Sequence, residues 1–117
     1  MKTKEYQKLA ARTNAELGSK LMNNIHMAFG LQTESGEFSD VFKKHIAYGK
    51  DIDYINLKEE VGDLLWYVAN LCNINDWDMG EIMTTNIEKL QVRYPEKFTQ
   101  EDAVNRNLER EREILEK

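Results

Sequence analysis

Apolar residues recur along this chain at intervals of three and four, which is the spacing that places them on one face of an α-helix. The pattern predicts a first helix over about 3–13 and a second over about 21–48. The second should stop near Gly49, a residue type that favours a left-handed helix end. The stretch 14–20, which contains Gly18, is either a turn or a continuation of helix. We find no useful segment with the two-residue period of a strand.

Capping signals mark the start of the next two helices. Asn56, followed by Glu59, predicts a capping box at the start of a third helix over about 56–73. Asp78 and Glu81 repeat this signature and open a fourth helix. Both segments carry apolar residues at helical spacing, so both should pack on a core.

Two further signals complete the expected architecture. The fourth helix should end before Pro95, because the residue preceding a proline disfavours helical geometry. Thr99 opens a fifth helix, charged and continuous over about 99–117. The sequence therefore predicts an all-α, antiparallel bundle of four to five helices. We expect a single domain over 1–117 with its core at about 21–98.

Two pairs of carboxylates lie within the apolar second and third helices. Glu34 with Glu37, and Glu60 with Asp63, are spaced i, i+3, so each pair projects from one helix face. At 100° per residue, each pair falls on the flank of the apolar stripe of its helix. When the two stripes pack together, the acidic flanks should meet in a shared pocket.

Such an acidic pocket needs protons or a cation. Two carboxylates about 5 Å apart repel each other by roughly 3 kcal/mol at an effective dielectric constant of about 20. Either some of the carboxylates stay protonated, or a hard divalent ion neutralises them.

Composition excludes several classes of protein. The formal net charge of −5 argues against a nonspecific nucleic-acid binder, which needs a basic face. No apolar run is long enough to span a membrane, and the first residues lead into polar sequence rather than a signal peptide. Cys72 is the single cysteine, so an intrachain disulfide is impossible. We expect a cytoplasmic protein.

The third helix is apolar nearly all round. Trp66 and Ala69 lie on the side away from its main apolar stripe, which leaves few polar positions. Such a helix must be covered on several sides, and in a chain of 117 residues we expect another subunit to provide the cover. The prediction is a homodimer or homotetramer, most simply a two-fold dimer.

The two acidic pairs, read with their surroundings, resemble a known family. Glu34-x-x-Glu37 followed by Glu60-x-x-Asp63 is similar to the ExxE…ExxD signature of the MazG-like nucleotide pyrophosphohydrolases. The segments LKEEVGDLLWYVANL and NIEKLQVRYPEKFTQEDA also resemble blocks of this family. The likeness covers about 26–103, most of the chain.

The resemblance implies an activity and a metal. It implies that the protein hydrolyses (deoxy)nucleoside triphosphates between the α and β phosphates, releasing a nucleoside monophosphate and pyrophosphate, in nucleotide-pool sanitation. It also implies that Glu34, Glu37, Glu60 and Asp63 hold Mg²⁺, for which Mn²⁺ can substitute. Glu37 or Glu34 would activate the attacking water, and we favour Glu37 slightly.

Candidate substrate contacts are Asn86, Lys89, Arg93, Lys44, Tyr67 and His26. Asn86, Lys89 and Arg93 share one face of the fourth helix and match the family block to which the resemblance assigns phosphate contacts. Surface salt bridges are the alternative for Lys89 and Arg93. Tyr67 and His26 suit contacts to the base and sugar, or packing in the core.

Two other functions compete with the nucleotide pyrophosphohydrolase. One is a non-catalytic helical module that binds nucleotide or metal and regulates a partner. The other is an activity like that of phosphoribosyl-ATP pyrophosphatase, a relative by fold. The intact set of four carboxylates, together with Lys89 and Arg93, favours the enzyme over the regulatory module.

Overall fold

The computed structural model describes all residues, 1–117, and contains six helices and no strand. The all-α class is therefore confirmed. The helices are α1 (Thr3–Ala11), α2 (Lys20–Tyr48), α3 (Tyr54–Ile74), α4 (Met79–Arg93), α5 (Gln100–Val104) and α6 (Leu108–Glu116). They belong to two compact units, 1–77 and 78–117. The single domain over 1–117 stays a prediction. No helix combines the length and apolar character needed to cross a bilayer.

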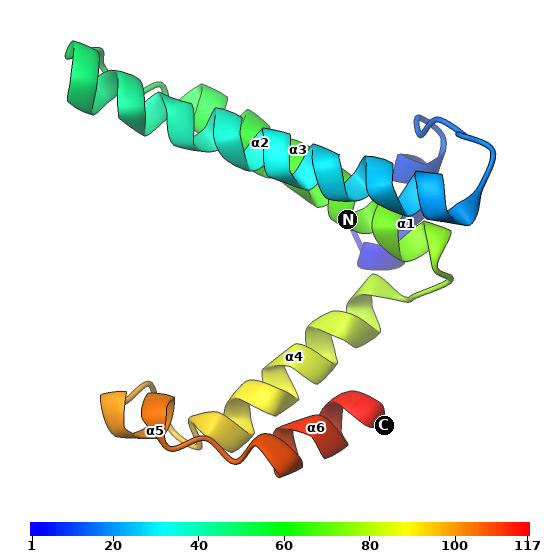
Figure 1. Cartoon of the computed structure of the whole chain (residues 1–117), viewed down its shortest axis with the longest axis vertical. Helices are drawn as coiled ribbons and strands as arrows, with labels where there is room; N and C mark the ends of the chain where they lie inside the picture. Colours follow the sequence, from blue (N-terminus) through cyan, green and yellow to red (C-terminus); the bar gives the residue numbers. More distant parts are fainter. The chain divides into compact units, whose positions relative to one another are not determined.

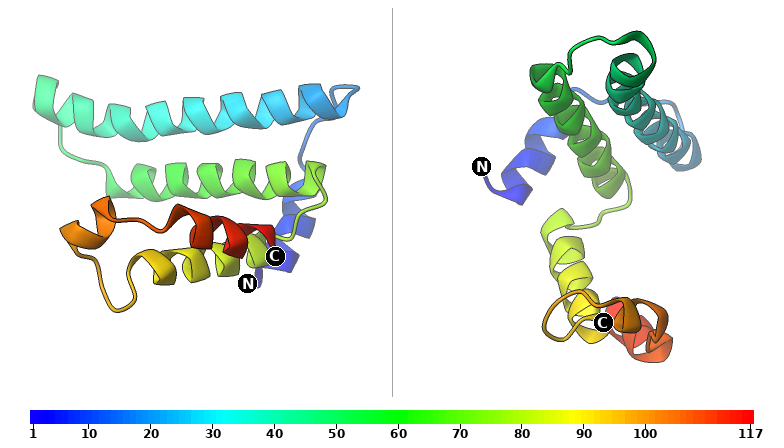
Figure 2. Two further views of the ribbon diagram at one scale, coloured as in Figure 1. Left: turned by 60° about the horizontal axis from the view of Figure 1, so that its bottom comes forward. Right: turned by 90° about the vertical axis from the view of Figure 1, so that its left-hand side faces the viewer.

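Helices α2 and α3 form an antiparallel hairpin in the first unit and lie side by side along their length (Figures 1 and 2). Gly49 ends α2 in the left-handed conformation, with φ of 65°, as the sequence predicted. The core of the hairpin includes Met27 from α2 and Ala69 and Cys72 from α3, all of which are buried. A second side of α3 packs on α1.

The start of α3 differs from the prediction. Asp53, not Asn56, is its N-cap, and the Asp53 carboxylate accepts hydrogen bonds from the backbone N–H groups of Ile55 and Asn56. The expected capping box of Asn56 with Glu59 is therefore wrong. An aspartate side chain accepts hydrogen bonds from the free N–H groups of a first helical turn as well as an asparagine does. Asp53, which comes first in the chain, is therefore the N-cap.

Helix α1 covers the side of α3 for which the sequence predicted another subunit. The Trp66 indole Nε1 donates to Thr13 Oγ1 at 2.8 Å. The fully buried Asn70 amide donates to the backbone carbonyl of Ala10 at 3.2 Å. Within the chain, Ala69 is fully buried, whereas Trp66 is only half-buried. The predicted oligomer itself stays a prediction.

The chain turns between α1 and α2. Helix α1 ends at Ala11, two residues before the predicted end, and Gly18 takes a φ of 92°, which suits a glycine. Ser19 then caps α2, accepting a hydrogen bond from the backbone N–H of Met22. The stretch 14–20 is therefore mainly a turn, one of the two predicted alternatives.

In the second unit, α4 packs against α6, and the two run antiparallel (Figure 2). Asp78 caps α4 by accepting from the backbone N–H of Glu81, which confirms the predicted start. Helix α4 ends at Arg93, before Pro95, as expected.

The predicted continuous helix over 99–117 is wrong, and six helices replace the four or five expected. Thr99 caps α5, as expected, but α5 ends at Val104. Asn107 then caps α6 through its side chain, which accepts from the backbone N–H of Arg110. An asparagine side chain competes for backbone hydrogen bonds and favours a new helix start over a helix interior.

Candidate metal and nucleotide site

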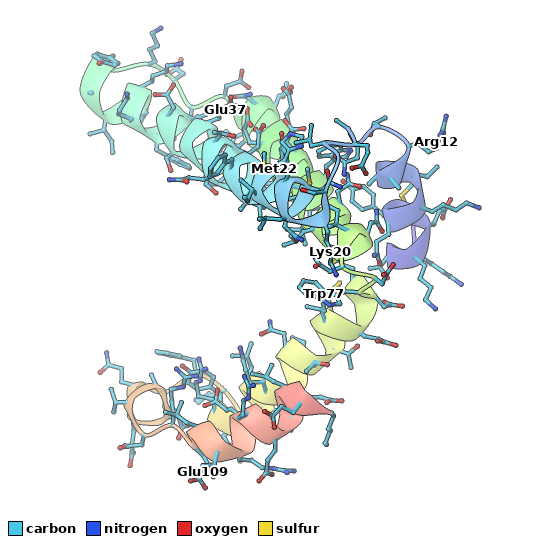
Figure 3. All side chains as sticks on the ribbon, turned by 45° about the vertical axis from the view of Figure 1, so that its right-hand side comes forward. Arg12, Lys20, Met22, Glu37, Trp77 and Glu109 are labelled. Atoms are coloured by element: carbon cyan, nitrogen blue, oxygen red, sulfur yellow. The ribbon has the colours of Figure 1, made fainter.

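Three carboxylates from the two helices of the α2–α3 hairpin come together. Glu34 and Glu37 of α2 and Glu60 of α3 each offer one oxygen, and the three oxygens lie within 4.8 Å of one another. We call Glu34, Glu37 and Glu60 the acidic cluster. Glu37 is its exposed member and is labelled on α2 in Figure 3. The expected meeting of the two acidic flanks is confirmed for these three residues.

Helical periodicity explains why Glu34 turns toward α3. It follows the buried Gly30 by four residues, and Gly30 faces Tyr67 of α3. Glu60 is buried, with 6% of its surface exposed, and its Oε1 accepts a hydrogen bond of 3.1 Å from the Asn56 amide. Sequence reasoning missed this role of Asn56, although its i, i+4 spacing to Glu60 was a usable signal.

The acidic cluster contains two buried oxygens that accept no hydrogen bond from an amide, a hydroxyl or a cationic group. Glu34 Oε2 and Glu60 Oε2 are inaccessible and have no hydrogen-bond partner. Leaving a buried polar atom unpaired costs about 1–3 kcal/mol, and more when it is charged. A cation that is coordinated by these carboxylate oxygens would remove this cost.

Electrostatics point the same way. The pKa of Glu34 is raised to about 7, first by burial, then by hydrogen bonding with Glu60 and Glu37, and by the charges of Glu37 and Asp63. The ordinary value is 4.5. Near neutral pH this carboxyl therefore holds a proton for a substantial part of the time, unless a cation replaces it.

A hard divalent cation fits these residues. The donors are all carboxylate oxygens, which Mg²⁺ and Mn²⁺ prefer, and two of them are buried and unpaired. Glu37 remains exposed, so the acidic cluster is open to solvent on one side. The chemistry of the donor set thus suits a metal that keeps free positions for water and phosphate oxygens.

Asp63, the fourth predicted ligand, lies beside the acidic cluster rather than within the group of three oxygens. It is half-buried, and its charge helps to raise the pKa of Glu34. It also contributes, after burial, to a raised pKa of the Tyr6 phenol on α1. The Tyr6 hydroxyl makes a long hydrogen bond of 3.5 Å to the carbonyl oxygen of Gly62.

Tyr67 and His26 lie next to each other in the same hairpin. Their ring centroids are 6.3 Å apart, with planes at 82°. The Tyr67 ring lies directly against Gly30, where a Cβ would overlap it. His26 Nδ1 is buried without a partner. Tyr67 has the packing contacts of the core alternative, and the nucleotide contacts of both residues stay predictions.

Lys44 lies on α2, two turns beyond Glu37, and forms an ion pair. Its Nζ is 2.9 Å from Asp40 Oδ2, and Lys43 approaches the other oxygen of the same carboxylate at 3.3 Å. This hydrogen bond raises the pKa of Lys44 and lowers that of Asp40. Its predicted contact with phosphate would compete with this exposed ion pair, which solvent screens and weakens.

The three candidates on α4 differ in their surroundings. Asn86 is exposed and Lys89 is half-buried. Arg93 is already paired: its Nη2 donates to Glu111 Oε1 at 2.7 Å. The salt bridge weighed for Arg93 therefore exists, with a residue of α6 that the sequence did not single out. Its contact with substrate stays a prediction.

The first unit also has an open pocket of about 520 Å³ at the start of α2, and no residue of the acidic cluster lines it. Four asparagines line it, Asn14, Asn23, Asn70 and Asn73. No sequence motif marked these residues, because asparagines at turns and helix ends commonly serve as caps. The carboxylates remain the part of this unit with metal-binding chemistry.

Comparison with known proteins gives the class. The MazG nucleotide pyrophosphohydrolase domain matches residues 23–98, which include all four motif carboxylates. The chain belongs to this family, whose members hydrolyse nucleotides with a divalent metal ion.

Among individual proteins, the chain is similar to the Gene 37 protein of Mycobacterium phage L5. The two are 32% identical over 88 residues, which cover 69% of this chain and 75% of the phage protein. No solved structure matches the chain. Helices α5 and α6 lie beyond the region that the family domain matches.

Proposed function

We propose that the protein is a Mg²⁺-dependent hydrolase that cleaves (deoxy)nucleoside triphosphates between the α and β phosphates. The observation that carries the proposal is the acidic cluster, in which carboxylates of α2 and α3 approach within 4.8 Å and two buried oxygens lack a partner. Membership of the nucleotide pyrophosphohydrolase family supplies the class of reaction. The products are a nucleoside monophosphate and pyrophosphate.

Glu34, Glu37, Glu60 and Asp63 would hold the divalent ion. When bound, such an ion neutralises triphosphate charge and lowers the pKa of nearby water. Glu60 is fixed for this role by its hydrogen bond from Asn56 and by burial. Glu34, whose ionised form is disfavoured in the metal-free protein, would hold the cation as a carboxylate, with the cation in place of its proton.

Glu37 is our candidate for the residue that receives the proton of the attacking water. It is the exposed carboxylate of the acidic cluster, so water and substrate can reach it. The water oxygen forms a bond to phosphorus while the anhydride bond between the α and β phosphates breaks. When the α phosphorus is attacked, the bonding electron pair leaves on the departing pyrophosphate. Glu34 is the second candidate for this step.

Cationic and aromatic residues would position the substrate. We assign phosphate contacts to Lys44, Asn86, Lys89 and Arg93, because a triphosphate needs positive partners beyond the metal. Tyr67 and His26 are adjacent in the hairpin and are our candidates for contacts to the base and sugar. We assign the activity to removal of surplus or noncanonical nucleotides.

We also propose that a second copy of the chain covers the exposed apolar residues. Val61 and Leu65, two apolar residues of α3, are about half exposed, at 45% and 44%. On α4, Ile82, Met83 and Ile87 are exposed to a similar degree. Such surface is typical of a subunit interface. Light scattering should show a dimer or tetramer, and a monomer at micromolar concentration would contradict this part.

A nucleotide panel tests the activity. Each of the common and several modified triphosphates is incubated with protein and Mg²⁺, and released pyrophosphate is measured. Glu37→Gln and Asp63→Asn should each abolish turnover while leaving the helical content unchanged. Glu59→Gln is the matched control, since Glu59 is exposed on the same helix and lies outside the acidic cluster. Nucleotide binding without pyrophosphate release would favour the regulatory module instead.

A further inference from the structure

A buried carboxylate lies in the second unit, far along the chain from the motif residues. Glu111 of α6 is only 2% exposed. Its Oε1 accepts from Arg93 Nη2 at 2.7 Å and from Arg106 Nη2 at 3.0 Å, and its Oε2 accepts from Arg106 Nε at 3.1 Å. Arg106 therefore binds both oxygens of the Glu111 carboxylate. This bidentate contact fixes the orientation of the carboxylate, and so the position of the Arg93 guanidinium that it binds.

The charges of this group do not cancel. Two guanidinium groups share one carboxylate, so the group formed by Arg93, Arg106 and Glu111 carries a net charge of about +1. The two arginines hold the pKa of Glu111 at about 2, mainly through their hydrogen bonds, so the carboxylate is ionised at every physiological pH. The surplus positive charge suits an anion.

The guanidinium of Arg93 is held in place by its neighbours, but one of its hydrogen-bond donors has no acceptor. Its side chain is 17% exposed, its Cζ lies 5.8 Å from the centre of the Tyr94 ring, and its Nε–H is buried without a partner. An exposed arginine would sample many rotamers and lose that freedom on binding phosphate. Here Glu111 and the Tyr94 ring already hold the planar group in one place.

Glu111 and Arg106 both lie beyond residues 23–98, the region that matches the family domain. Stability alone does not explain their arrangement, because apolar side chains of similar volume can replace a buried ion cluster without loss of stability. Arg93, by contrast, lies inside the matched region, on the helix to which we assign phosphate contacts.

We propose that Glu111, held by Arg106, is a positioning residue that fixes the Arg93 guanidinium for contact with a substrate phosphate. The proposal rests on the function proposed above. It also explains what the segment that contains α5 and α6 contributes, since this segment supplies the counter-charge that fixes an arginine of the family domain.

Binding of a non-hydrolysable triphosphate provides the test, because it does not depend on turnover. The ligand is an α,β-methylene deoxynucleoside triphosphate with Mg²⁺, and the dissociation constant is measured by calorimetry. Glu111→Gln keeps the shape but not the charge, and should weaken binding between about 10- and 100-fold, as expected for a misplaced binding group. Glu113→Gln is the matched control, since Glu113 lies on α6 in an exposed pair with Arg110. It should bind like the wild type.

A double-mutant cycle separates positioning from a general structural effect. If Glu111 acts through Arg93, then Glu111→Gln should cause no further loss in an Arg93→Ala background. Equal losses in both backgrounds would overturn the proposal, and so would unchanged binding by Glu111→Gln. Arg106→Gln, at a residue that is 40% exposed, is a milder variant that leaves the Arg93–Glu111 pair in place. It should weaken binding in the same sense, which keeps the test decisive if Glu111→Gln fails to fold.

The two proposals fail in different ways. Tight binding of the analogue without pyrophosphate release from any natural nucleotide would refute the proposed reaction. The double-mutant cycle of Glu111 and Arg93 would still test the positioning role. Wild-type affinity in Arg93→Ala would refute the positioning role, whatever the turnover.

Discussion

The ring of Tyr67 on α3 lies against the backbone of Gly30 on α2, in space that any side chain at position 30 would need. This contact lies one helical turn before Glu34 and so sets how closely the two helices approach beside the acidic cluster. Gly30 is buried, and Met27, one turn earlier, is fully buried. The absence of a Cβ at one position therefore helps to bring carboxylates of two helices together.

Gly30→Ala should destabilise the protein by about 1–3 kcal/mol, because the new methyl group must displace the Tyr67 ring. The measurement is urea unfolding followed by circular dichroism. Gly36→Ala is the control on the same helix: nothing lies within 4 Å of its added Cβ, and alanine should stabilise the helix by roughly 0.5–1 kcal/mol. Equal effects of the two substitutions would contradict the close contact.

The metal-free protein should lose stability as the pH rises from about 4.5 to about 7. Glu34 has its pKa raised to about 7 in the folded state, against an ordinary 4.5, so the folded protein binds more protons than the unfolded chain in this window. The free energy of unfolding therefore falls with pH and levels off above the folded pKa. Thermal melts in the presence of chelator at several pH values measure this pH dependence of stability. In Glu34→Gln, stability should change less with pH between about 4.5 and 7.

Magnesium should oppose that loss. A cation binds the ionised form of Glu34, so its stabilising effect should be larger at pH 8 than at pH 5.5. At a concentration about one hundred times the dissociation constant, the gain should be about 2.7 kcal/mol. Melting temperatures with Mg²⁺ and with chelator give the comparison at each pH. A gain in melting temperature that is independent of pH would exclude Glu34 as a ligand.

Asp53→Ala should cost about 1 kcal/mol, since two backbone N–H groups at the start of α3 lose their acceptor. Asp51→Ala, in the same connection and also exposed, is the control and should have little effect. Denaturant midpoints of the two variants provide the measurement. A larger loss for Asp51→Ala would show that the helix is capped differently.

Asn70→Ala should destabilise the protein by roughly 1–3 kcal/mol, because the buried amide that joins α3 to the backbone of α1 is lost. The change should be greatest in α1, so amide hydrogen exchange of residues 3–11 is the most direct measurement. Unchanged protection of α1 would show that the helix is held mainly by its other contacts.

Much of the helical structure could be predicted because its signals are local. Gly49 ends α2, Asp78 starts α4 and Thr99 starts α5, each through a cap that its own residue type favours. Where two capping residues compete, local signals are not sufficient. Asp53 precedes Asn56 and caps α3. Asn107 starts a new helix within 99–117, where the sequence predicted a single charged helix.

The candidate site shows the same division between local and tertiary information. The spacing of the carboxylates within α2 and α3 predicted that all four meet, and three of them, Glu34, Glu37 and Glu60, approach one another. Contacts between distant residues were not accessible from periodicity. The pairing of Arg93 with Glu111 joins residues 18 positions apart, across a break in the helix that the sequence pattern did not reveal.

The Tyr6 phenol of α1 lies next to Gly62 and Asp63 of α3. Its hydroxyl contacts the carbonyl of Gly62, and its ionisation is disfavoured partly by the neighbouring charge of Asp63. A helix outside the segment matching the family domain thus borders one of the proposed magnesium ligands. If Asp63 binds the metal as proposed, a tag or truncation that disturbs the first residues should change the affinity of the protein for Mg²⁺.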